Sequence, residues 1–296
     1  MGVTAKAAKM RTADPQVVRR LNEIVGGDRV VTSVEELVVY GYDATLPEYL
    51  PDVIVFPDTA QQVSEILRFA NQEKIPVYPR GSGTNLSGGS IPLKGGIVLG
   101  LAKMNRILEV NKENLYAVVE PGVVNADFQA HLQPMGLFYP PDPASMNVCT
   151  LGGNVAEGSG GPRCLKYGLT RDYILGLEVV LPTGEIIRTG GVTVKNSTGY
   201  DLTRLFVGSE GTLGVVTRIT CRLLPIFEDK KTMLAVFSDI GDASATVGAI
   251  ISAGIIPLTL ELMDNILINC SEDFVGAGLP RDAEAILLIE VDGFRE

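Results

Sequence analysis

The feature that most constrains this chain is a glycine-rich stretch directly after a short apolar run. Ile75–Tyr78 predicts a strand, and Pro79–Gly89 then places four glycines within nine residues. Glycine adopts positive φ and lets a ligand approach the main chain closely. Successive backbone N–H groups in such a turn form a concavity that suits phosphate oxygens. The stretch therefore predicts a diphosphate-binding loop at a strand end, with a flexible surface loop or a glycine-rich hairpin as the alternative.

Spacing separates this loop from two better-known phosphate-binding motifs. A dinucleotide fingerprint starting at Gly81 and Gly83 would need glycine or alanine at position 86, which is Leu86. A P-loop starting at Gly83 reaches Gly88 but then needs lysine where Gly89 stands. The loop therefore predicts neither an ordinary NAD site nor an NTPase site.

The composition restricts the classes of partner. The chain has 296 residues, room for about two domains. Its net charge of -10 argues against nucleic acid, because duplex binding needs a basic face. The four cysteines form no CxxC pair, so no zinc or iron–sulfur site is predicted, and a reducing, cytoplasmic compartment is favoured. No secretory signal is predicted, and no membrane span either, since no run of about 18 apolar residues occurs.

Hydrophobic patterning predicts mixed helices and strands. Helices are expected over 15–25, 34–40, about 60–70 and 125–135, and strands over 53–56, 75–78, 96–101, 107–110, 116–120, 174–181, 185–189 and 215–224. Thr59 and Gln62 have the spacing of a capping box, and Asn125 is expected to cap its helix. Residues 140–170 are rich in proline and glycine and are predicted to hold few regular elements.

The pattern changes after Pro225. Strands are expected over 232–237, 258–262 and 285–291, and helices over 243–253 and 264–270. This β-α-β-α-β order is that of the beginning of a ferredoxin-like domain.

Seven segments, read together, resemble the FAD-linked oxidase family with a vanillyl-alcohol-oxidase (PCMH)-type FAD-binding domain. They are Pro79–Gly89, Tyr139–Ser145, Thr150–Ala156, Gly160–Thr170, Asp172–Gly184, Thr193–Leu205 and Gly208–Thr217. The resemblance covers about residues 49–296 and is greatest to the branch that contains glycolate oxidase, through its D-type polypeptide, and D-lactate dehydrogenase.

The resemblance implies an α+β fold in which two α+β subdomains hold FAD between them. The expected domains are an N-terminal helical leader (1–48), the FAD-binding domain (49–228) and a partial C-terminal cap, or substrate, domain with the start of a ferredoxin-like fold (229–296).

The resemblance also assigns residues to FAD. The matching positions are Arg80, Gly81, Ser82, Gly83, Thr84 and Asn85 at the diphosphate; Pro141 and Asp142 in the proline-rich loop; Thr150, Gly152, Gly153 and Asn154 along the diphosphate and ribityl chain; Gly160, Gly161 and Thr170 beside the flavin; and Glu210, Gly211, Val215 and Val216 at the adenosine end. Some relatives attach FAD through a histidine in the glycine loop. No histidine lies in residues 79–89, so noncovalent FAD is expected.

Several of these residues have ordinary structural alternatives. Asp142 could simply order the proline-rich loop, and Gly208–Gly214 could be a turn between strands. Lys195 could be a solvated charge, although its motif matches one near the flavin. Cys164 is expected to be a packing residue, and His131, the one histidine, is expected to lie on a helix without a catalytic role.

The function implied by the resemblance is oxidation of a small 2-hydroxy acid, D-lactate or glycolate, by hydride transfer from C2 to flavin N5. Electrons would pass to an acceptor outside this chain: an electron-transfer flavoprotein, an iron–sulfur subunit or a quinone. The expected location is the cytoplasm, with association to a membrane through a partner, and oligomer formation, as open alternatives.

The base and the metal site of this branch have no candidate residues here. A histidine-rich motif with a Gly-Asp-Gly-Asn core normally follows later, and it is missing from this chain. The alternatives are therefore a FAD-binding fragment, a non-catalytic flavin subunit of a larger complex, or the same scaffold acting on a bulkier 2-hydroxy acid or a sugar lactone.

Overall fold

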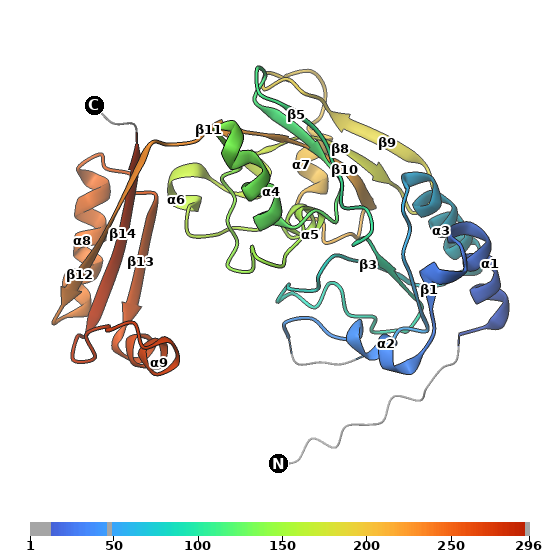
Figure 1. Cartoon of the computed structure of the whole chain (residues 1–296), viewed down its shortest axis with the longest axis horizontal. Helices are drawn as coiled ribbons and strands as arrows, with labels where there is room; N and C mark the ends of the chain where they lie inside the picture. Colours follow the sequence, from blue (N-terminus) through green and yellow to red (C-terminus); the bar gives the residue numbers. More distant parts are fainter. Residues whose placement is uncertain (1–12, 46–48, 294–296) are drawn as a thin grey trace, which may run out of the picture. The chain divides into compact units, whose positions relative to one another are not determined.

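The computed structural model describes residues 13–45 and 49–293, in two compact units (Figure 1). The first unit holds the described residues up to Tyr139, then Ser145–Ser159 and Thr170–Leu224. The second unit holds Pro140–Ala144, Gly160–Leu169 and the described chain from Pro225 onward. Residues 1–12 and 46–48 of the predicted leader, and 294–296 of the predicted cap, lie outside the described residues.

A mixed four-stranded sheet forms one half of the first unit, in the order β1-β2-β4-β3. Its strands are β1 (Val30–Val31), β2 (Val53–Val55), β3 (Val77–Arg80) and β4 (Ile97–Gly100), and the associated helices are α1 (Pro15–Val25), η1 (Gly27–Arg29), α2 (Val34–Val39) and α3 (Ala60–Glu73). Strands β2, β4 and β3 run parallel, and β1 pairs antiparallel with β2. The stretch predicted as a helical leader thus also supplies an edge strand.

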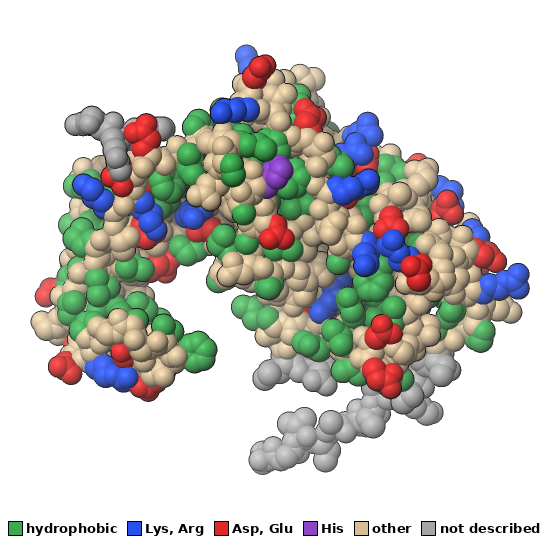
Figure 2. Space-filling model, in the orientation of Figure 1, with side chains coloured by type: hydrophobic (Ala, Val, Ile, Leu, Met, Phe, Trp, Pro, Cys, Tyr) green, Lys and Arg blue, Asp and Glu red, His purple; other side chains and the backbone are tan. Residues whose placement is uncertain are grey.

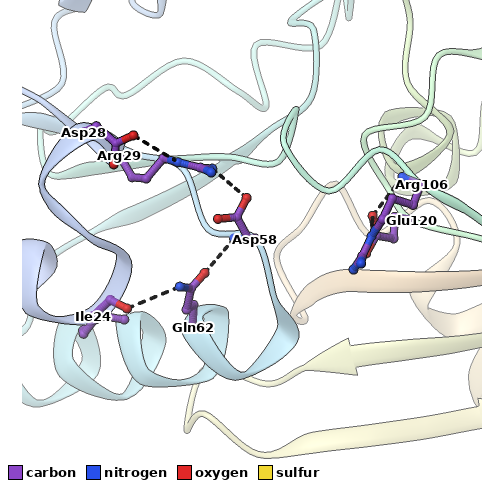
Figure 3. A network of polar contacts seen from close by, with 7 residues as sticks. All are labelled: Ile24, Asp28, Arg29, Asp58, Gln62, Arg106 and Glu120. Carbon is purple, nitrogen blue, oxygen red and sulfur yellow. Dashed lines mark hydrogen bonds and ion pairs between the residues drawn. The ribbon is translucent and has the colours of Figure 1, made fainter.

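A polar network joins the first helices to the start of α3 (Figure 3). Thr59 caps α3 as predicted, because its hydroxyl accepts the Gln62 N–H at 3.2 Å. The Gln62 side chain accepts the Asp58 N–H at 2.7 Å and donates to the Ile24 carbonyl at 3.4 Å. Asp58 also pairs with Arg29 at 2.6 Å. The second arm of the capping box therefore reaches Asp58 and not Thr59.

A five-stranded antiparallel sheet forms the other half, in the order β5-β6-β10-β8-β9. Its strands are β5 (Ile107–Asn111), β6 (Tyr116–Val119), β8 (Ile174–Val180), β9 (Ile186–Gly190) and β10 (Val215–Arg222). Other elements of this half are α4 (Asn125–Leu132), η2 (Gln133–Met135), β7 (Leu137–Phe138), α5 (Leu151–Glu157), η3 (Thr170–Asp172), α7 (Leu202–Phe206) and β11 (Leu224–Pro225). Next to β6, the buried Glu120 carboxylate accepts from the Arg106 guanidinium at 2.7 Å (Figure 3).

The two sheets share one hydrophobic core, in which α3 is central. Val63 and Ile66 of α3 are fully buried and belong to the same cluster as Val180 of β8 and Val215 of β10. Burial of this kind contributes about 1.5–3 kcal/mol for each large aliphatic side chain. The first unit is thus built of two α+β halves on a common core, and the predicted α+β class is confirmed.

The prediction of few regular elements over residues 140–170 was wrong in part. Helix α5 forms because the Thr150 hydroxyl accepts the Gly153 N–H at 3.2 Å and caps it. Gly152 costs helix propensity, but a Cβ there would lie 2.5 Å from the Pro121 Cβ, so only glycine fits. A shorter helix, α6 (Cys164–Tyr167), follows in the second unit. The predicted cap of α4, Asn125, is instead its first residue.

The second unit contains β12 (Asp229–Phe237), α8 (Ile240–Ser252), β13 (Thr259–Asp264), α9 (Asn265–Val275) and β14 (Ala285–Gly293). The sheet order is β12-β14-β13, and both outer strands pair antiparallel with β14. Helix α8 therefore connects two strands that flank a third. This split β-α-β arrangement is the ferredoxin-like topology that the sequence predicts.

Charge on the surface is mixed. In the view of Figure 2, Lys and Arg side chains are interspersed with Asp and Glu, without a continuous basic area. No helix over residues 13–45 and 49–293 is long and apolar enough to cross a bilayer. Among these same residues there is no group of three or more His, Cys, Asp or Glu that could hold a metal ion.

Candidate functional site

A groove in the first unit begins where β3 ends. The glycine-rich loop after β3 forms one side, and α5 and the turn before β10 complete it. The predicted positions that line it are Arg80, Gly81, Ser82, Gly83, Thr84, Asn85, Thr150, Gly152, Gly153, Asn154, Glu210, Gly211, Val215 and Val216. Segments far apart in the sequence thus meet around one hollow.

The two glycine-containing loops touch each other directly. A Cβ on Gly81 would lie 2.3 Å from the Thr150 hydroxyl oxygen, so any larger residue would push the loops apart. Ser82 adds a tie on the same side, since its hydroxyl donates to the Val148 carbonyl. The close approach leaves main-chain groups of both loops facing one space.

Arg80 provides a fixed positive charge under the loop. Its side chain is buried, and a Cβ on Gly83 would lie 2.1 Å from Nη2. Nη1 donates to the Ser90 hydroxyl at 3.3 Å, and the guanidinium lies 5.5 Å from the centre of the Tyr40 ring. Burial lowers the pKa of Arg80, while Tyr40 and Asp43 oppose that fall. A guanidinium stays charged at neutral pH even so, so it offers a cation to the groove.

Asn154 supplies a buried donor without a partner. Its side-chain nitrogen makes no hydrogen bond of good geometry with the described residues, although it lies near the Cys149 thiol. Burial raises the pKa of Cys149, and Ser145 and Asn154 lower it. An unsatisfied buried amide costs about 1–3 kcal/mol. A ligand acceptor atom in the groove would remove that cost.

Acidic side chains line another part of the groove. The Glu157 carboxylate accepts from the Ser87 hydroxyl at 3.1 Å. A Cβ on Gly89 would lie 3.2 Å from Oε2 of Glu210, whose backbone has a positive φ of 52°. Burial raises the pKa of Glu157, Ser87 lowers it, and Glu210 and Asp43 raise it further. The groove thus offers donors to an anion on one part and acceptors to hydroxyl or amine groups on another.

Five predicted positions do not line this groove. Pro141, Asp142, Gly160 and Gly161 belong to the second unit, and Thr170 belongs to the first. Gly161 packs against Asp142, since a Cβ would meet the Asp142 carbonyl oxygen at 2.2 Å. The Asp142 carboxylate pairs with Arg163 at 3.1 Å; burial raises its pKa and Arg163 lowers it. The Thr170 hydroxyl donates to the Ser159 carbonyl at 2.8 Å. Contact of these positions with FAD stays a prediction.

Some groove residues had no individual prediction. Ser90, Cys149, Glu157, Ser209 and Gly214 line the groove, and the sequence shows no pattern that marks Ser90 or Glu157. His131 and Lys195 are exposed and do not line it.

The groove tests whether FAD fits this chain. FAD carries a diphosphate, ribityl and ribose hydroxyls and ring acceptors, and the groove offers a buried guanidinium, an unpartnered amide donor and carboxylates. Glycines at the contacts between the loops admit a ligand close to the main chain. The residues present therefore fit the cofactor.

Solved structures share this fold. The chain superposes on an alkyldihydroxyacetonephosphate synthase with a TM-score of 0.84 and 21% identity, over 100% of this chain and 59% of that one. It superposes on p-cresol methylhydroxylase with a TM-score of 0.76 and 23% identity, over 95% of this chain and 61% of that one. At this identity, the likeness shows the fold alone.

Curated relatives are more similar in sequence. The chain is 51% identical to glycolate oxidase subunit GlcD of Bacillus subtilis (strain 168), over 94% of this chain and 59% of the relative. Identity is 44% to glycolate oxidase subunit GlcD of Escherichia coli (strain K12), over 94% and 56%. It is 41% to a D-lactate dehydrogenase of Archaeoglobus fulgidus, over 87% and 59%. The chain therefore spans less than two thirds of each of these relatives.

Two family models match in the order of the two units. The model described as FAD binding domain matches residues 51–190, which include the glycine-rich loop and α5. The model described as FAD linked oxidases, C-terminal domain, matches residues 226–296. The chain belongs to the FAD-linked oxidases, with an FAD-binding domain followed by a segment that matches the oxidase C-terminal domain.

Proposed function

We propose that this chain is the FAD-carrying part of an oxidoreductase that oxidises a small 2-hydroxy acid. D-Lactate and glycolate are the first candidates, because the relatives named above are glycolate oxidase subunits and a D-lactate dehydrogenase. The observation that carries the proposal is the pairing, in one groove, of the buried Arg80 guanidinium with the unpartnered amide of Asn154. Both groups need an electron-rich ligand.

The residues of the groove divide the work of holding the cofactor. Arg80 and the N–H groups of residues 81–85 would bind the diphosphate, and Asn154 would donate to an acceptor of the cofactor. Glu210 would accept from a hydroxyl group at the adenosine end. FAD would supply the acceptor for the hydride that leaves C2 of the hydroxy acid. Because residues 79–89 contain no histidine, these contacts are proposed to be noncovalent.

Electrons would leave to a separate chain or a quinone. The four cysteines do not have the spacing of a cluster-binding motif, so an electron-transfer flavoprotein, an iron–sulfur subunit or a quinone would accept them. We propose a cytoplasmic location, with any attachment to a membrane provided by that partner. The oligomeric state is open in this proposal.

The proposal is tested by anaerobic reduction of the FAD-loaded chain. D-Lactate, glycolate and, as controls, L-lactate and acetate are added separately, and the visible absorbance of the flavin is followed. Bleaching by D-lactate or glycolate but not by acetate is expected, and bleaching by L-lactate alone would contradict the proposed substrate hand. Bound FAD that no hydroxy acid bleaches would favour the alternative, a FAD-binding polypeptide without catalysis of its own.

A further inference from the structure

An aspartate outside the matched FAD-binding domain contacts the glycine-rich loop. Asp43 lies between α2 and β2, before residue 51, where the family model begins. Its side chain is buried, with 5% of the residue surface exposed. It does not line the groove. A carboxylate is costly to bury, so its partners indicate what it stabilises.

The Asp43 carboxylate holds the loop at two places. Oδ2 accepts from the Asn85 side-chain amide at 2.7 Å and from the Gly88 N–H at 3.0 Å. Oδ1 accepts from the Thr45 N–H at 2.8 Å, which keeps the carboxylate itself in place. The Ala44 N–H donates to the Asn85 carbonyl at 3.1 Å. The short segment around Asp43 therefore fixes both the middle and the end of the loop.

The hydrogen bonds continue from Asp43 to the cation of the groove. Asn85 gives its N–H to Asp43, so its Oδ1 is left to accept the Ser90 hydroxyl at 2.9 Å. The Ser90 oxygen in turn accepts from Arg80 Nη1 at 3.3 Å. The charge of Asp43 also raises the pKa of Arg80 against the effect of burial. One carboxylate thus orients an amide, a hydroxyl and a guanidinium in series.

We propose that Asp43 is a positioning residue for FAD: it acts through Asn85 and Ser90 to hold Arg80 and the loop in the conformation that binds the diphosphate. This inference rests on the proposed function, since it takes FAD as the ligand. An asparagine at position 43 keeps the size but loses the charge and one acceptor. The Asn85 amide and the Gly88 N–H would then compete for the single remaining oxygen.

The test is a titration of the cofactor-free protein with FAD, followed by quenching of flavin fluorescence, together with the melting temperature of the cofactor-free protein. Asp43→Asn is expected to weaken FAD binding by about 10- to 100-fold, the effect of losing one or two charge-assisted hydrogen bonds. Asp52→Asn is the matched control. Asp52 anchors another loop of the same sheet by accepting the Gly96 N–H at 2.8 Å, and it does not line the groove. FAD affinity in the control is expected to change less than about 2-fold.

A double variant separates positioning from a general loss of stability. Ser90→Ala breaks the same series of hydrogen bonds, so Asp43→Asn combined with Ser90→Ala should bind FAD about as weakly as Asp43→Asn alone. Fully additive losses would overturn the relay. If Asp43→Asn does not fold, Ser90→Ala alone is measured, and unchanged FAD affinity there overturns the proposal.

The outcomes also separate this inference from the function on which it rests. Failure of the unmodified chain to bind FAD would reject the proposed function. Binding by the unmodified chain that Asp43→Asn leaves unchanged would reject only the role of Asp43.

Discussion

At the scale of single residues, Gly83 and Arg80 form a contact that no other pair of residue types would permit. Gly83 has a positive φ of 69°, and a Cβ there would occupy the space of the Arg80 guanidinium. The glycine is thus required both by backbone conformation and by the neighbouring side chain. This explains why the loop needs glycine at this position, whereas the spacing of known motifs does not.

The variant Gly83→Ala is expected to weaken FAD binding by at least about 10-fold, because it displaces the cation that binds the diphosphate. Gly88→Ala is the matched control: Gly88 has a similar φ of 79°, but a Cβ there meets no atom within 4 Å. Both variants carry a left-handed backbone strain of roughly 1–2 kcal/mol. Equal FAD dissociation constants for the two variants, measured by fluorescence titration, would show that the contact with Arg80 does not matter.

Glu157 should make FAD binding depend on pH. Burial raises its folded-state pKa above the ordinary value, so it takes up a proton in the folded protein at a pH where the unfolded chain is still ionised. The folded state therefore carries a penalty above the raised pKa, which is relieved as pH falls through it. Loss of this negative charge should also favour an anionic ligand. FAD affinity is thus expected to rise as pH falls from 7 towards that pKa.

The check is the variant Glu157→Gln, which removes the charge at every pH. It should bind FAD about two- to fivefold more tightly at pH 7.5, as expected for one charge at a solvated site. Its pH dependence between 5 and 7 should be flatter than that of the unmodified chain. Parallel pH profiles of the FAD dissociation constant for the two proteins would contradict this account.

At the scale of elements, α6 is attached to the last strand of the second unit by one buried carboxylate. The Asp292 side chain has no exposed surface, pairs with Lys166 and accepts from the Tyr167 hydroxyl at 2.6 Å. Helix α6 has only four residues, so it cannot be stable by its own hydrogen bonds. Its position therefore depends on this tertiary contact.

Asp292→Asn is expected to destabilise the second unit by about 1–3 kcal/mol, because Lys166 loses its charge partner while remaining partly buried. Limited proteolysis should then cleave within residues 160–169 sooner than in the unmodified chain. Glu290→Gln is the control, since its partner Lys230 is more exposed and their pair is expected to contribute about 0–1 kcal/mol. Cleavage at equal rates in both variants would argue against the role of Asp292.

Elements with a clear period could be predicted from the sequence, and elements held by tertiary contacts could not. Helix α1 has the predicted bounds Pro15–Val25, because Asp14 caps it and Gly26 ends it. Helix α5 could not be predicted, since Gly152 and Gly153 have low helix propensity and are tolerated only through packing.

The same division holds in the groove. Most of its glycine and polar positions follow a family pattern, so the sequence could indicate them. Asp43 follows no such pattern in one sequence. Its role depends on hydrogen bonds to residues more than 40 positions away, at Asn85 and Gly88. Tertiary relations of this kind become visible only in the folded chain.

At the scale of the whole molecule, the chain carries a net charge of -10 and yet has a groove that fits an anionic cofactor. The long-range field opposes the approach of FAD and is screened by salt over roughly 10 Å at 0.1 M. The contacts that decide affinity are shorter than this distance. Fixed local groups such as Arg80, and not the overall charge, therefore determine whether the cofactor stays bound.

The measurement that tests the central claim most directly is titration of the purified, cofactor-free chain with FAD, followed by acid denaturation and ultrafiltration. The account predicts saturable binding of one FAD per chain and complete release of the flavin into the filtrate, because the cofactor is held by noncovalent contacts. Absence of saturable binding by a folded chain would contradict the assignment of the groove. Flavin that stays with the denatured protein would contradict the noncovalent contacts proposed for residues 79–89.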